Sequence, residues 1–454
     1  MMRVGSLSQS RLPTSSRFSR SAEKAAYEMR KLMQVSLSVS NMEQRWILSL
    51  LASAMISIAL LLLANLTWGF RGYQPVLSVQ RSRYSNQLQS TLEITNNRTM
   101  AILPPPPKLA YLISGTKGDG RRMQRLLRAL YHPHNYYLLH LDLEAPMRER
   151  AELVWHVKKQ LVYEEVMNVF VIGKSNLVTY RGPTMVAATL HGAAILLRKA
   201  KDWDWFINLS ASDYPLVTQD DLLHVFSYLP KDLNFIEHTS ALGWKEFQRA
   251  RPIIMDPGLY QKKKTNIYWT TQKRASPSAF RLFTGSAWIA LTRSFMEYCN
   301  VGWDNLPRTA LMYYTNFLSS PEGYFQTVIC NSREFRNTTV NHDLHFIAWH
   351  NPPRQHPITL SFTFYRNMTK SGAPFARKFD KGSAVLDKID REILNRRMNE
   401  FTPGGWCIGL NDDPCGVRGD PTLLRPGPGS RRFEELVVRL LAHPNFRSQQ
   451  CVGT

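Results

Sequence analysis

The stretch WDWFINLSASDYPLVT, from Trp203 to Thr218, decides which fold the sequence predicts. Its first half, Trp205 to Leu209, is a short run of aromatic and branched apolar residues, which predicts a buried parallel strand. Its second half places small polar residues and Asp213 at the carboxyl end of that strand, where open α/β sheets bind their ligands. A helix is predicted to follow, because Thr218 is a suitable N-cap and Asp220 and Asp221 suit the first turn of a helix.

The segments before this stretch repeat the alternation of strand and helix. Apolar runs predict strands at residues 110–114, 136–142 and 168–172, and amphipathic patterns predict helices after the first and third of them. This order is typical of a parallel sheet with helices on both faces. The glycines between residues 115 and 120 match neither the dinucleotide-binding fingerprint nor the phosphate-binding loop. The residues alone therefore predict an α/β domain that uses a nucleotide, without specifying the reaction.

Composition limits the partners of the chain. The 454 residues carry a formal net charge of +22 and are 44% hydrophobic, which is enough for one large core or two ordinary ones. Such a charge attracts anions, which include nucleic acid, anionic lipid, nucleotides and acidic glycans. No zinc-finger spacing and no aromatic RNA-binding signature accompanies it, so we expect no nucleic-acid partner.

The N-terminal region predicts a membrane anchor. Residues 1–45 form a polar, serine-rich tail, and residues 46–66 are an uncharged apolar run that would span about one bilayer as a helix. The alternative is a buried core helix, which the uncharged length disfavours. Basic residues before the run favour a cytosolic N-terminus. We expect a single-pass signal anchor, then a stem at residues 67–107 that ends in four prolines, with the rest of the chain in a secretory lumen.

Cysteines and glycosylation motifs agree with a lumenal location. All five cysteines follow the predicted anchor and none forms a C-x-x-C metal pair, so four of them can form two disulfides and leave one free. The pairing is not readable from the sequence. Of five Asn-x-Ser/Thr motifs, Asn65 is too near the membrane and Asn208 lies within the predicted strand. The reasonable glycan sites are Asn97, Asn337 and Asn367.

Several ordered motifs between about residues 108 and 385 resemble one enzyme family. They are LAYLISGT at 109–116, LLHLD at 138–142, LVTYRG at 177–182, WDWFINLSASDYP at 203–215, GSAWIAL at 285–291 and SPEGYFQTVICNS at 320–332. Together they resemble the core-2/I-branching family, glycosyltransferase family 14, which joins animal branching N-acetylglucosaminyltransferases and protein xylosyltransferases to a plant branch. The strings NHDLHFIAWHNPPRQHP at 341–357 and SGAPFARKFD at 371–380 resemble that plant branch, whose studied members resemble β-glucuronosyltransferases of arabinogalactan proteins.

The resemblance implies a GT-A-like Rossmann domain at residues 108–385. We expect residues 386–454, which include an amphipathic helix at residues 431–441, to pack on it. It also implies a nucleotide-sugar donor and inversion at the anomeric carbon. Glu322 matches the xylosyltransferase glutamate in a catalytic position, and we assign it as the general base that takes the proton of the acceptor hydroxyl. In the animal branching enzymes the corresponding carboxylate stands at this position or one place along, so the offset stays open. Ala287 stands where xylosyltransferases carry a catalytic aspartate, which argues against xylose transfer by their mechanism.

The resemblance further implies the residues that bind the donor. Asp142 matches a nucleoside-contacting aspartate, Tyr180 a donor-contacting tyrosine, and Lys378 a lysine that stabilises the leaving diphosphate in place of a metal ion. Either Arg354 or His356 lies near a second cationic position of the family. The full predicted donor set is Ser114, Thr116, Asp142, Tyr180, Arg181, Asp213, Lys378, Arg354 and His356. No metal ion and no other cofactor is expected.

Three further hypotheses concern single features of the sequence. The guanidinium of Arg181 can bind a glucuronate carboxylate through two hydrogen bonds, or it can form a structural ion pair, and both remain open. Asp202 and Asp204 fit the Asp-x-Asp metal motif, but they precede their strand and are predicted to lie away from the ligand edge. The predicted acceptor subsite follows the next strand and consists of Glu237, Trp244 and Lys245.

The sequence thus predicts a Golgi type II membrane glycosyltransferase. Its predicted reaction moves glucuronic acid from UDP-glucuronate to galactan side chains of arabinogalactan proteins. One alternative keeps the family fold but transfers N-acetylglucosamine or xylose from its UDP-sugar. The other is a membrane-anchored glycan-binding protein without activity, against which the intact Glu322 and Lys378 argue.

Overall fold

A computed structural model describes residues 30–31, 104–261, 265–352, 354–410, 413–444 and 446–452 of the chain. The predicted anchor at residues 46–66, most of the predicted stem and the predicted glycan site Asn97 lie outside these residues. Within the described ranges, no helix combines the length and the apolar character that a membrane span requires. The compact unit Thr99–Thr454 holds every strand of the described part.

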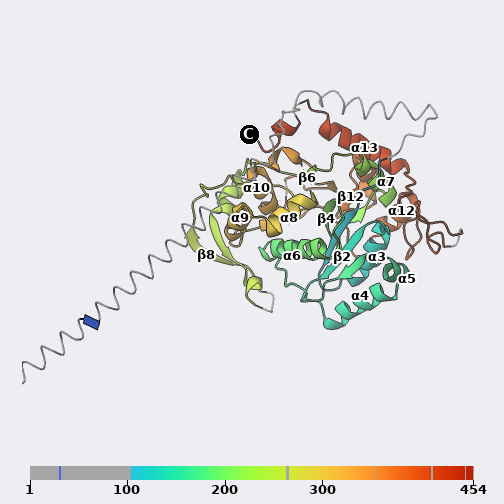
Figure 1. Cartoon of the computed structure of the whole chain (residues 1–454), viewed down its shortest axis with the longest axis horizontal. Helices are drawn as coiled ribbons and strands as arrows, with labels where there is room; N and C mark the ends of the chain where they lie inside the picture. Colours follow the sequence, from blue (N-terminus) through green and yellow to red (C-terminus); the bar gives the residue numbers. More distant parts are fainter. Residues whose placement is uncertain are drawn as a thin grey trace, which may run out of the picture. The chain divides into compact units, whose positions relative to one another are not determined.

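The strands fall into three sheets. They are β1 Leu109–Gly115, β2 Tyr136–Leu141, β3 Val169–Val171, β4 Trp205–Ser210, β5 Tyr214–Pro215, β6 Asn234–Ile236, β7 Pro252–Met255, β8 Tyr268–Lys273, β9 Ile289–Thr292, β10 Thr339–Val340, β11 His345–Ile347 and β12 Phe375–Arg377. The main sheet has the order β10-β6-β9-β4-β1-β2-β3, a small sheet has the order β11-β12-β5, and β7 pairs with β8 alone. Every pairing in the main sheet is parallel except the two that β9 makes, so the predicted mostly parallel central sheet is confirmed (Figure 1).

Helices cover both faces of the main sheet. They are α3 Gly120–Leu130, α4 Met147–Lys159, α5 Leu161–Val166, α6 Thr184–Lys199, α7 Gln219–Ser227, α8 Arg293–Val301, α9 Leu306–Tyr314, α10 Tyr324–Asn331, α11 Tyr365–Ser371, α12 Val385–Glu392 and α13 Pro428–Leu441. A π-helical turn covers Glu246–Ala250, and 3₁₀ turns cover Pro257–Leu259, Ser320–Glu322, Arg336–Thr338, Phe362–Phe364 and Arg447–Gln449.

Alternating side chains of the central strands build two cores. In β4, Trp205, Ile207 and Leu209 pack into one hydrophobic cluster with α3, α7 and α13, whereas Phe206 packs into the other with α6, α8 and α10. All four side chains are at most 1% exposed. A strand that is buried on both faces reads as a continuous apolar run, which is the pattern that predicted β4. The result is three layers, with helices on both sides of the sheet (Figure 1).

The predicted helix after the opening stretch begins at the predicted cap. The Thr218 hydroxyl accepts the backbone N–H of Asp221 at 3.1 Å, and the Asp221 carboxylate accepts the N–H of Thr218 at 3.0 Å. This reciprocal capping box satisfies two backbone donors and fixes the start of α7. The chain is therefore turned back over the sheet immediately after the polar residues at the end of β4.

The C-terminal segment rests on α7. The carboxylate of Asp220 accepts the backbone N–H groups of Gly405 at 2.7 Å and Arg425 at 2.6 Å. Further along, Phe433 of α13 is fully buried, and its ring lies 5.9 Å from the ring of Phe226 in α7. Figure 1 shows α13 alongside α7. The domain boundary predicted near residue 385 stays a prediction.

Two disulfides and one buried free cysteine account for the five cysteines. Cys330 pairs with Cys451 across 121 residues, and Cys407 pairs with Cys415 across 8 residues. Cys299 is free and buried in α8. The predicted number of disulfides is confirmed, and the structure supplies the pairing that the sequence left open.

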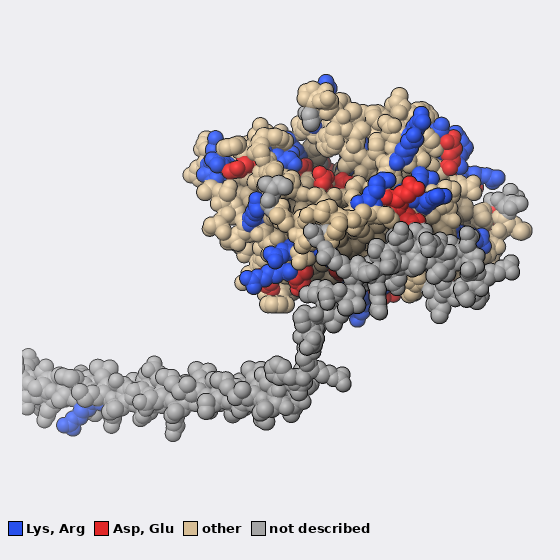
Figure 2. Space-filling view, turned by 90° about the horizontal axis from the view of Figure 1, so that it is seen from above, with Lys and Arg blue, Asp and Glu red and all other residues tan. Residues whose placement is uncertain are grey.

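Charged side chains of both signs share the surface. On the face drawn in Figure 2, Lys and Arg side chains lie among Asp and Glu side chains. A net charge of +22 therefore does not by itself mark a polyanion-binding face, and the ligand site has to be located from geometry.

Candidate active site

The carboxyl edge of the main sheet gathers the predicted ligand residues. β1, β2, β4 and β6 run parallel or are related through the antiparallel β9, so their carboxyl ends meet at one edge. Open α/β sheets bind ligands at such an edge. The strands deliver Ser114 and Thr116 from β1, Asp142 from β2, Asp213 from β4 and Glu237 from β6.

The first two strands end in polar side chains with local partners. Asp142 is 1% exposed, and its carboxylate accepts the backbone N–H groups of Glu144 at 2.8 Å and Val178 at 3.0 Å. It therefore holds the loop that leads to Tyr180. Ser114 is half-buried at the end of β1, while the exposed Thr116 donates its hydroxyl and backbone N–H to Asp119 at 3.2 and 3.0 Å.

Asp213 holds a cation rather than standing ready as a base. Its carboxylate is fully buried and accepts the N–H of Ser210 at 2.7 Å and the hydroxyl of Ser210 at 2.9 Å. Arg377 Nε lies 3.5 Å from one carboxylate oxygen and His345 Nε2 lies 4.0 Å from the other. Asp213 thus lies within ion-pair distance of these two side chains, and its role in donor binding stays a prediction.

Arg377 is a site residue that the sequence did not reveal. Its guanidinium lies 3.9 Å from the centre of the Trp288 ring, and the side chain keeps 18% exposure. Burial lowers its pKa, and the charge of Asp213 opposes that shift. Arg377 directly precedes Lys378, so the only signal in the sequence was a pair of adjacent cations.

Tyr180 and His356 meet from distant parts of the chain. The Tyr180 hydroxyl lies 3.2 Å from His356 Nδ1, and the two rings stack with their centres 5.5 Å apart. Partial burial and the nearby positive charges of Lys378 and Arg181 lower the pKa of His356. Of the two residues proposed for the second cationic position, the structure brings His356 against the donor residues, while Arg354 is exposed two residues before it.

Arg181 is held by its backbone in a conformation that is unusual for its type. Its φ is +62°, in the left-handed region, and its carbonyl accepts the N–H of Ser319 at 2.8 Å. Its Nε is buried and has no hydrogen-bond partner among the described residues. No ion pair of Arg181 occurs in the described part, so the structural ion pair proposed as the alternative role is not found there.

Glu322 ends the 3₁₀ turn Ser320–Glu322, directly before α10, as the sequence predicted. Its carboxylate accepts a hydrogen bond from Arg249 Nη1 at 2.5 Å, and its side chain is 33% exposed. Its own carbonyl accepts the N–H of Gly285 and the hydroxyl of Thr284, each at 2.9 Å. Glu322 is thus fixed at both its backbone and its side chain, while the side chain stays partly exposed.

The predicted acceptor residues lie around Glu322. Lys245 donates to the Thr284 hydroxyl at 3.2 Å; burial lowers its pKa, and the charges of Glu322 and Glu237 oppose that shift. Burial and the neighbouring Asp343 raise the pKa of Glu237. Trp244 is 56% exposed. The structure therefore brings Glu237 and Lys245 near Glu322, and their predicted roles in acceptor binding stay predictions.

Arg249 joins this group without having been predicted. Its guanidinium lies 5.1 Å from the centre of the Trp244 ring and also bonds to Glu322. It stands in the π-helical turn Glu246–Ala250, four residues after Lys245. The spacing of four residues between Lys245 and Arg249 was the available signal in the sequence. It indicates a site residue only when the structure shows that the turn faces Glu322.

A cavity of about 540 Å³ opens beside the donor residues. Its walls include Tyr180 and Arg181 from the loop before α6, Glu144 after β2, and Trp269 from the β7–β8 hairpin. Cavities of this size are typical of small-molecule sites. It is large enough for a nucleotide or a sugar.

The Asp-x-Asp pair lies at the opposite edge, as predicted. Asp204 accepts the N–H of Lys108 at 2.9 Å and bonds to Lys231 at 2.8 Å, while Asp202 bonds to Lys108 and Tyr136. Lys108 directly precedes β1, so both carboxylates serve the amino ends of the central strands.

The glycosylation motifs also differ in their surroundings. Asn337 and Asn367 are exposed, as their prediction requires. Asn208 uses its amide inside the sheet, where it bonds to the carbonyl of Ala287 and the N–H of Ile289, each at 2.9 Å. Its sequon therefore carries no accessible acceptor.

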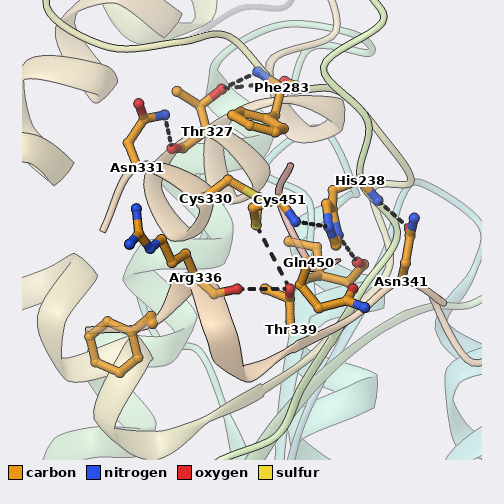
Figure 3. The surroundings of a disulfide bond; sticks show 12 residues. His238, Phe283, Thr327, Cys330, Asn331, Arg336, Thr339, Asn341, Gln450 and Cys451 are labelled. Carbon is orange, nitrogen blue, oxygen red and sulfur yellow. Dashed lines mark hydrogen bonds between the residues drawn. A yellow bond between two sulfur atoms is a disulfide. The ribbon is translucent and has the colours of Figure 1, made fainter. Parts of the chain in front are cut away.

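The Cys330–Cys451 disulfide lies beside the acceptor side of the edge. Cys330 belongs to α10, which follows Glu322, and the N–H of Cys451 donates to His238 Nε2 at 3.1 Å (Figure 3). His238 follows Glu237 at the end of β6, and its N–H donates to Asn341 at 2.7 Å (Figure 3). The end of the described chain thus ties together two elements that carry predicted site residues.

A partly exposed carboxylate and a cavity lined by Tyr180 and Arg181, at the carboxyl edge of a mostly parallel sheet, are the arrangement in which α/β enzymes bind a nucleotide-linked ligand. The family model for core-2/I-branching enzymes matches residues 109–369, and the chain belongs to this family of glycosyltransferases. The recognition made from the motifs is confirmed, and the chain is an enzyme.

Two named plant relatives share most of their length with this chain, and a xylosyltransferase shares less of its length. β-Glucuronosyltransferase GlcAT14A of Arabidopsis thaliana is 64% identical over 352 residues, which cover 77% of this chain and 79% of that protein. β-Glucuronosyltransferase GlcAT14B of the same plant is 55% identical over 433 residues, which cover 93% of this chain and all of that protein. Xylosyltransferase 1 of Rattus norvegicus is 28% identical over 69% of this chain and 39% of that protein.

Proposed function

We propose that the protein is an inverting β-glucuronosyltransferase that moves glucuronic acid from UDP-glucuronate to galactan side chains of arabinogalactan proteins. The observation that carries the proposal is the 64% identity, over 352 residues, to a relative named as a β-glucuronosyltransferase. Xylosyltransferase 1 is only 28% identical to this chain. The chain also has Ala287 where a catalytic aspartate is expected for xylose transfer, and the backbone carbonyl of Ala287 is bonded to Asn208.

The proposed reaction uses Glu322 as the base. Its carboxylate takes the proton of the acceptor hydroxyl while the hydroxyl oxygen attacks the anomeric carbon of the donor sugar. The bond from that carbon to the diphosphate breaks on the opposite face, and UDP leaves with the bonding electrons. Arg249 orients the carboxylate at 2.5 Å, and the position of Lys245 beside it suits binding of an acceptor hydroxyl.

Cationic side chains carry the proposed stabilisation of the leaving group. Arg377, Lys378 and His356 come from β12 and the loops beside it, and Asp213 fixes Arg377 from the end of β4. Positive charge that is already in place as the diphosphate leaves lowers the barrier, as a bound metal ion would. We therefore propose a GT-A-like donor site that works without a metal ion.

The proposed setting is the Golgi lumen, behind a single-pass anchor at residues 46–66. The exposed Asn337 and Asn367 and the two disulfides suit an oxidising lumen. Disulfides form and persist in such compartments and are rare in the cytosol.

Incubation of the full-length protein with UDP-glucuronate, UDP-N-acetylglucosamine or UDP-xylose and a galactan acceptor tests the donor. We expect product from UDP-glucuronate, and the same rate after treatment with EDTA. Product from UDP-N-acetylglucosamine alone would overturn the glucuronate assignment, and loss of the product in EDTA would overturn metal independence.

The Arg181 guanidinium supplies a second test of the donor sugar. If it binds the glucuronate carboxylate, Arg181→Ala raises the KM for UDP-glucuronate by about tenfold or more and leaves UDP binding unchanged, because a charge-assisted pair contributes about 1.5–3 kcal/mol. Arg181→Lys serves as the conservative variant and should recover part of the loss. An equal loss for UDP-glucuronate and UDP-xylose would contradict the carboxylate contact.

A further inference from the structure

The β7–β8 hairpin is a separate element attached beside the donor residues. β7 Pro252–Met255 and β8 Tyr268–Lys273 pair antiparallel with each other and with no other strand of the described part. Trp269 stands opposite Ile254 in this pairing, and Tyr268 stands opposite Met255. Figure 1 shows β8 projecting to one side of the main sheet.

The base of the hairpin is fixed to the catalytic domain. Ile254 is fully buried, and its backbone N–H and carbonyl bond to Asn316 at 3.1 and 2.9 Å. Asp256 accepts the hydroxyl of Thr184 at 2.7 Å, and the same hydroxyl accepts the N–H of Thr179 at 2.8 Å. Through these bonds β7 is coupled to the loop that carries Tyr180.

The free strand of the hairpin lines the cavity with one face. Trp269 and the segment Thr265–Ile267 line the cavity from the hairpin, and Thr179, Tyr180 and Arg181 line it from the loop before α6. Trp269 and Tyr268 are each 54% exposed, but only Trp269 lines the cavity. Successive strand residues point to opposite faces, which explains the difference.

Three polar atoms around the cavity have no partner. The Thr179 and Thr265 hydroxyls and Arg181 Nε are each buried and make no hydrogen bond within the described ranges. The large majority of buried polar side-chain atoms in proteins are hydrogen-bonded. Both sides of the cavity therefore carry polar side chains with unused hydrogen-bonding capacity, which suits a polar ligand.

We propose that the β7–β8 hairpin is one wall of the donor site and that the nucleotide-sugar lies between Trp269 and the Tyr180–Arg181 loop. This proposal rests on the proposed function only in taking a UDP-sugar as the occupant. The Trp269 indole supplies an apolar face with large contact area, and the Thr265 hydroxyl supplies a hydrogen bond from the hairpin side.

Two single variants of adjacent residues test the proposal. Binding of UDP-glucuronate, UDP-N-acetylglucosamine and UDP-xylose to the full-length protein is measured by calorimetry for Trp269→Ala and for Tyr268→Ala. We expect Trp269→Ala to weaken the best-bound UDP-sugar about tenfold, because an aromatic contact contributes about 0.5–1.5 kcal/mol beyond its buried area. Tyr268→Ala, at equal exposure on the other face, should leave the affinity unchanged.

The outcomes separate this proposal from the proposed function. If Trp269→Ala leaves every affinity unchanged, or if both variants weaken binding equally, the hairpin is not a wall of the donor site. If the unaltered protein binds another UDP-sugar better than UDP-glucuronate, the glucuronate assignment fails while the hairpin is still judged by the Trp269→Ala result. Thr265→Val provides an independent check and should weaken the same UDP-sugar by about three- to tenfold through loss of one hydrogen bond.

Discussion

At the residue scale, Arg249 holds the carboxylate of the proposed base, Glu322. Replacing the carboxylate by an amide of the same shape, in Glu322→Gln, removes the proton acceptor and keeps the packing. We expect the transfer rate to fall by about 10²- to 10⁴-fold, with UDP-sugar affinity within about twofold of the unaltered protein. Steady-state rates with a galactan acceptor, together with calorimetry, measure both quantities.

A matched control for Glu322 lies in the π-helical turn nearby. Glu246 forms a surface ion pair with Arg251 at 2.9 Å, so Glu246→Gln changes the charge by the same amount without touching the base. It should leave the rate unchanged. A Glu322→Gln protein that retains full activity would remove Glu322 from the role of base.

His140 makes the stability of the protein depend on pH. It is 2% exposed in β2, its Nε2 accepts the N–H of Asn176 at 3.0 Å, and burial lowers its pKa to about 4. The unfolded chain, with a histidine pKa near 6.5, binds more protons between these two values. The contribution of His140 is therefore fully present above about pH 6.5 and is lost as the pH falls toward 4.

Urea unfolding at pH 7 and pH 5 measures this dependence. Because the pKa difference corresponds to about 3 kcal/mol in total, we expect His140 to account for a loss of roughly 2 kcal/mol between the two pH values. His140→Gln should reduce that loss, and His443→Gln, at an exposed position, should not. Equal pH dependence in all three proteins would contradict the assignment.

Residues of the site divide into those with a local signal and those without. Glu322 and Tyr180 stand in motifs that resemble a family, so the sequence located them. Arg249 and Arg377 acquire their places through Glu322 and Asp213, which lie 73 and 164 residues away in the chain. No local pattern encodes a pairing over that distance, so the sequence could not have named them.

At the scale of elements, α13 near the end of the chain packs on α7 in the catalytic domain. Phe433 is fully buried against α7, so Phe433→Ala should destabilise the protein by about 3–5 kcal/mol through lost contacts and a cavity. Val438→Ala, on the exposed side of the same helix, should cost less than about 1 kcal/mol. Urea unfolding at pH 7 measures both, and equal losses would mean that α13 does not use this face.

Elements with local signals were predictable, and those set by distant pairing were not. The Thr218 cap and the apolar run of β4 are each encoded within a few consecutive residues, and both were predicted. The insertion of β9 between β4 and β6 was not, because a four-residue strand carries no mark of its neighbours. The same limit applies to the hairpin, whose exposed β8 lacks the clean alternation of a half-buried strand.

At the scale of the whole molecule, the two disulfides should differ in what they contribute. In the chain-entropy model a crosslink constrains the unfolded chain more when it closes a longer loop. Loops of 121 and 8 residues then correspond to about 5 and about 2.5 kcal/mol. We expect Cys330→Ser with Cys451→Ser to lower the free energy of unfolding more than Cys407→Ser with Cys415→Ser, and the reverse order in urea unfolding would contradict this.

The order of the strands along the chain also has a consequence for biosynthesis. Strands β1 to β4 are complete once residue 210 has been synthesised. The Cys330–Cys451 disulfide needs Cys451, which follows 241 residues later. At a synthesis rate of about 5–20 residues per second, this interval lasts about 12–50 s. For that time a newly made chain therefore has its first four parallel strands but lacks this disulfide, so chaperones and disulfide-forming enzymes can act on it.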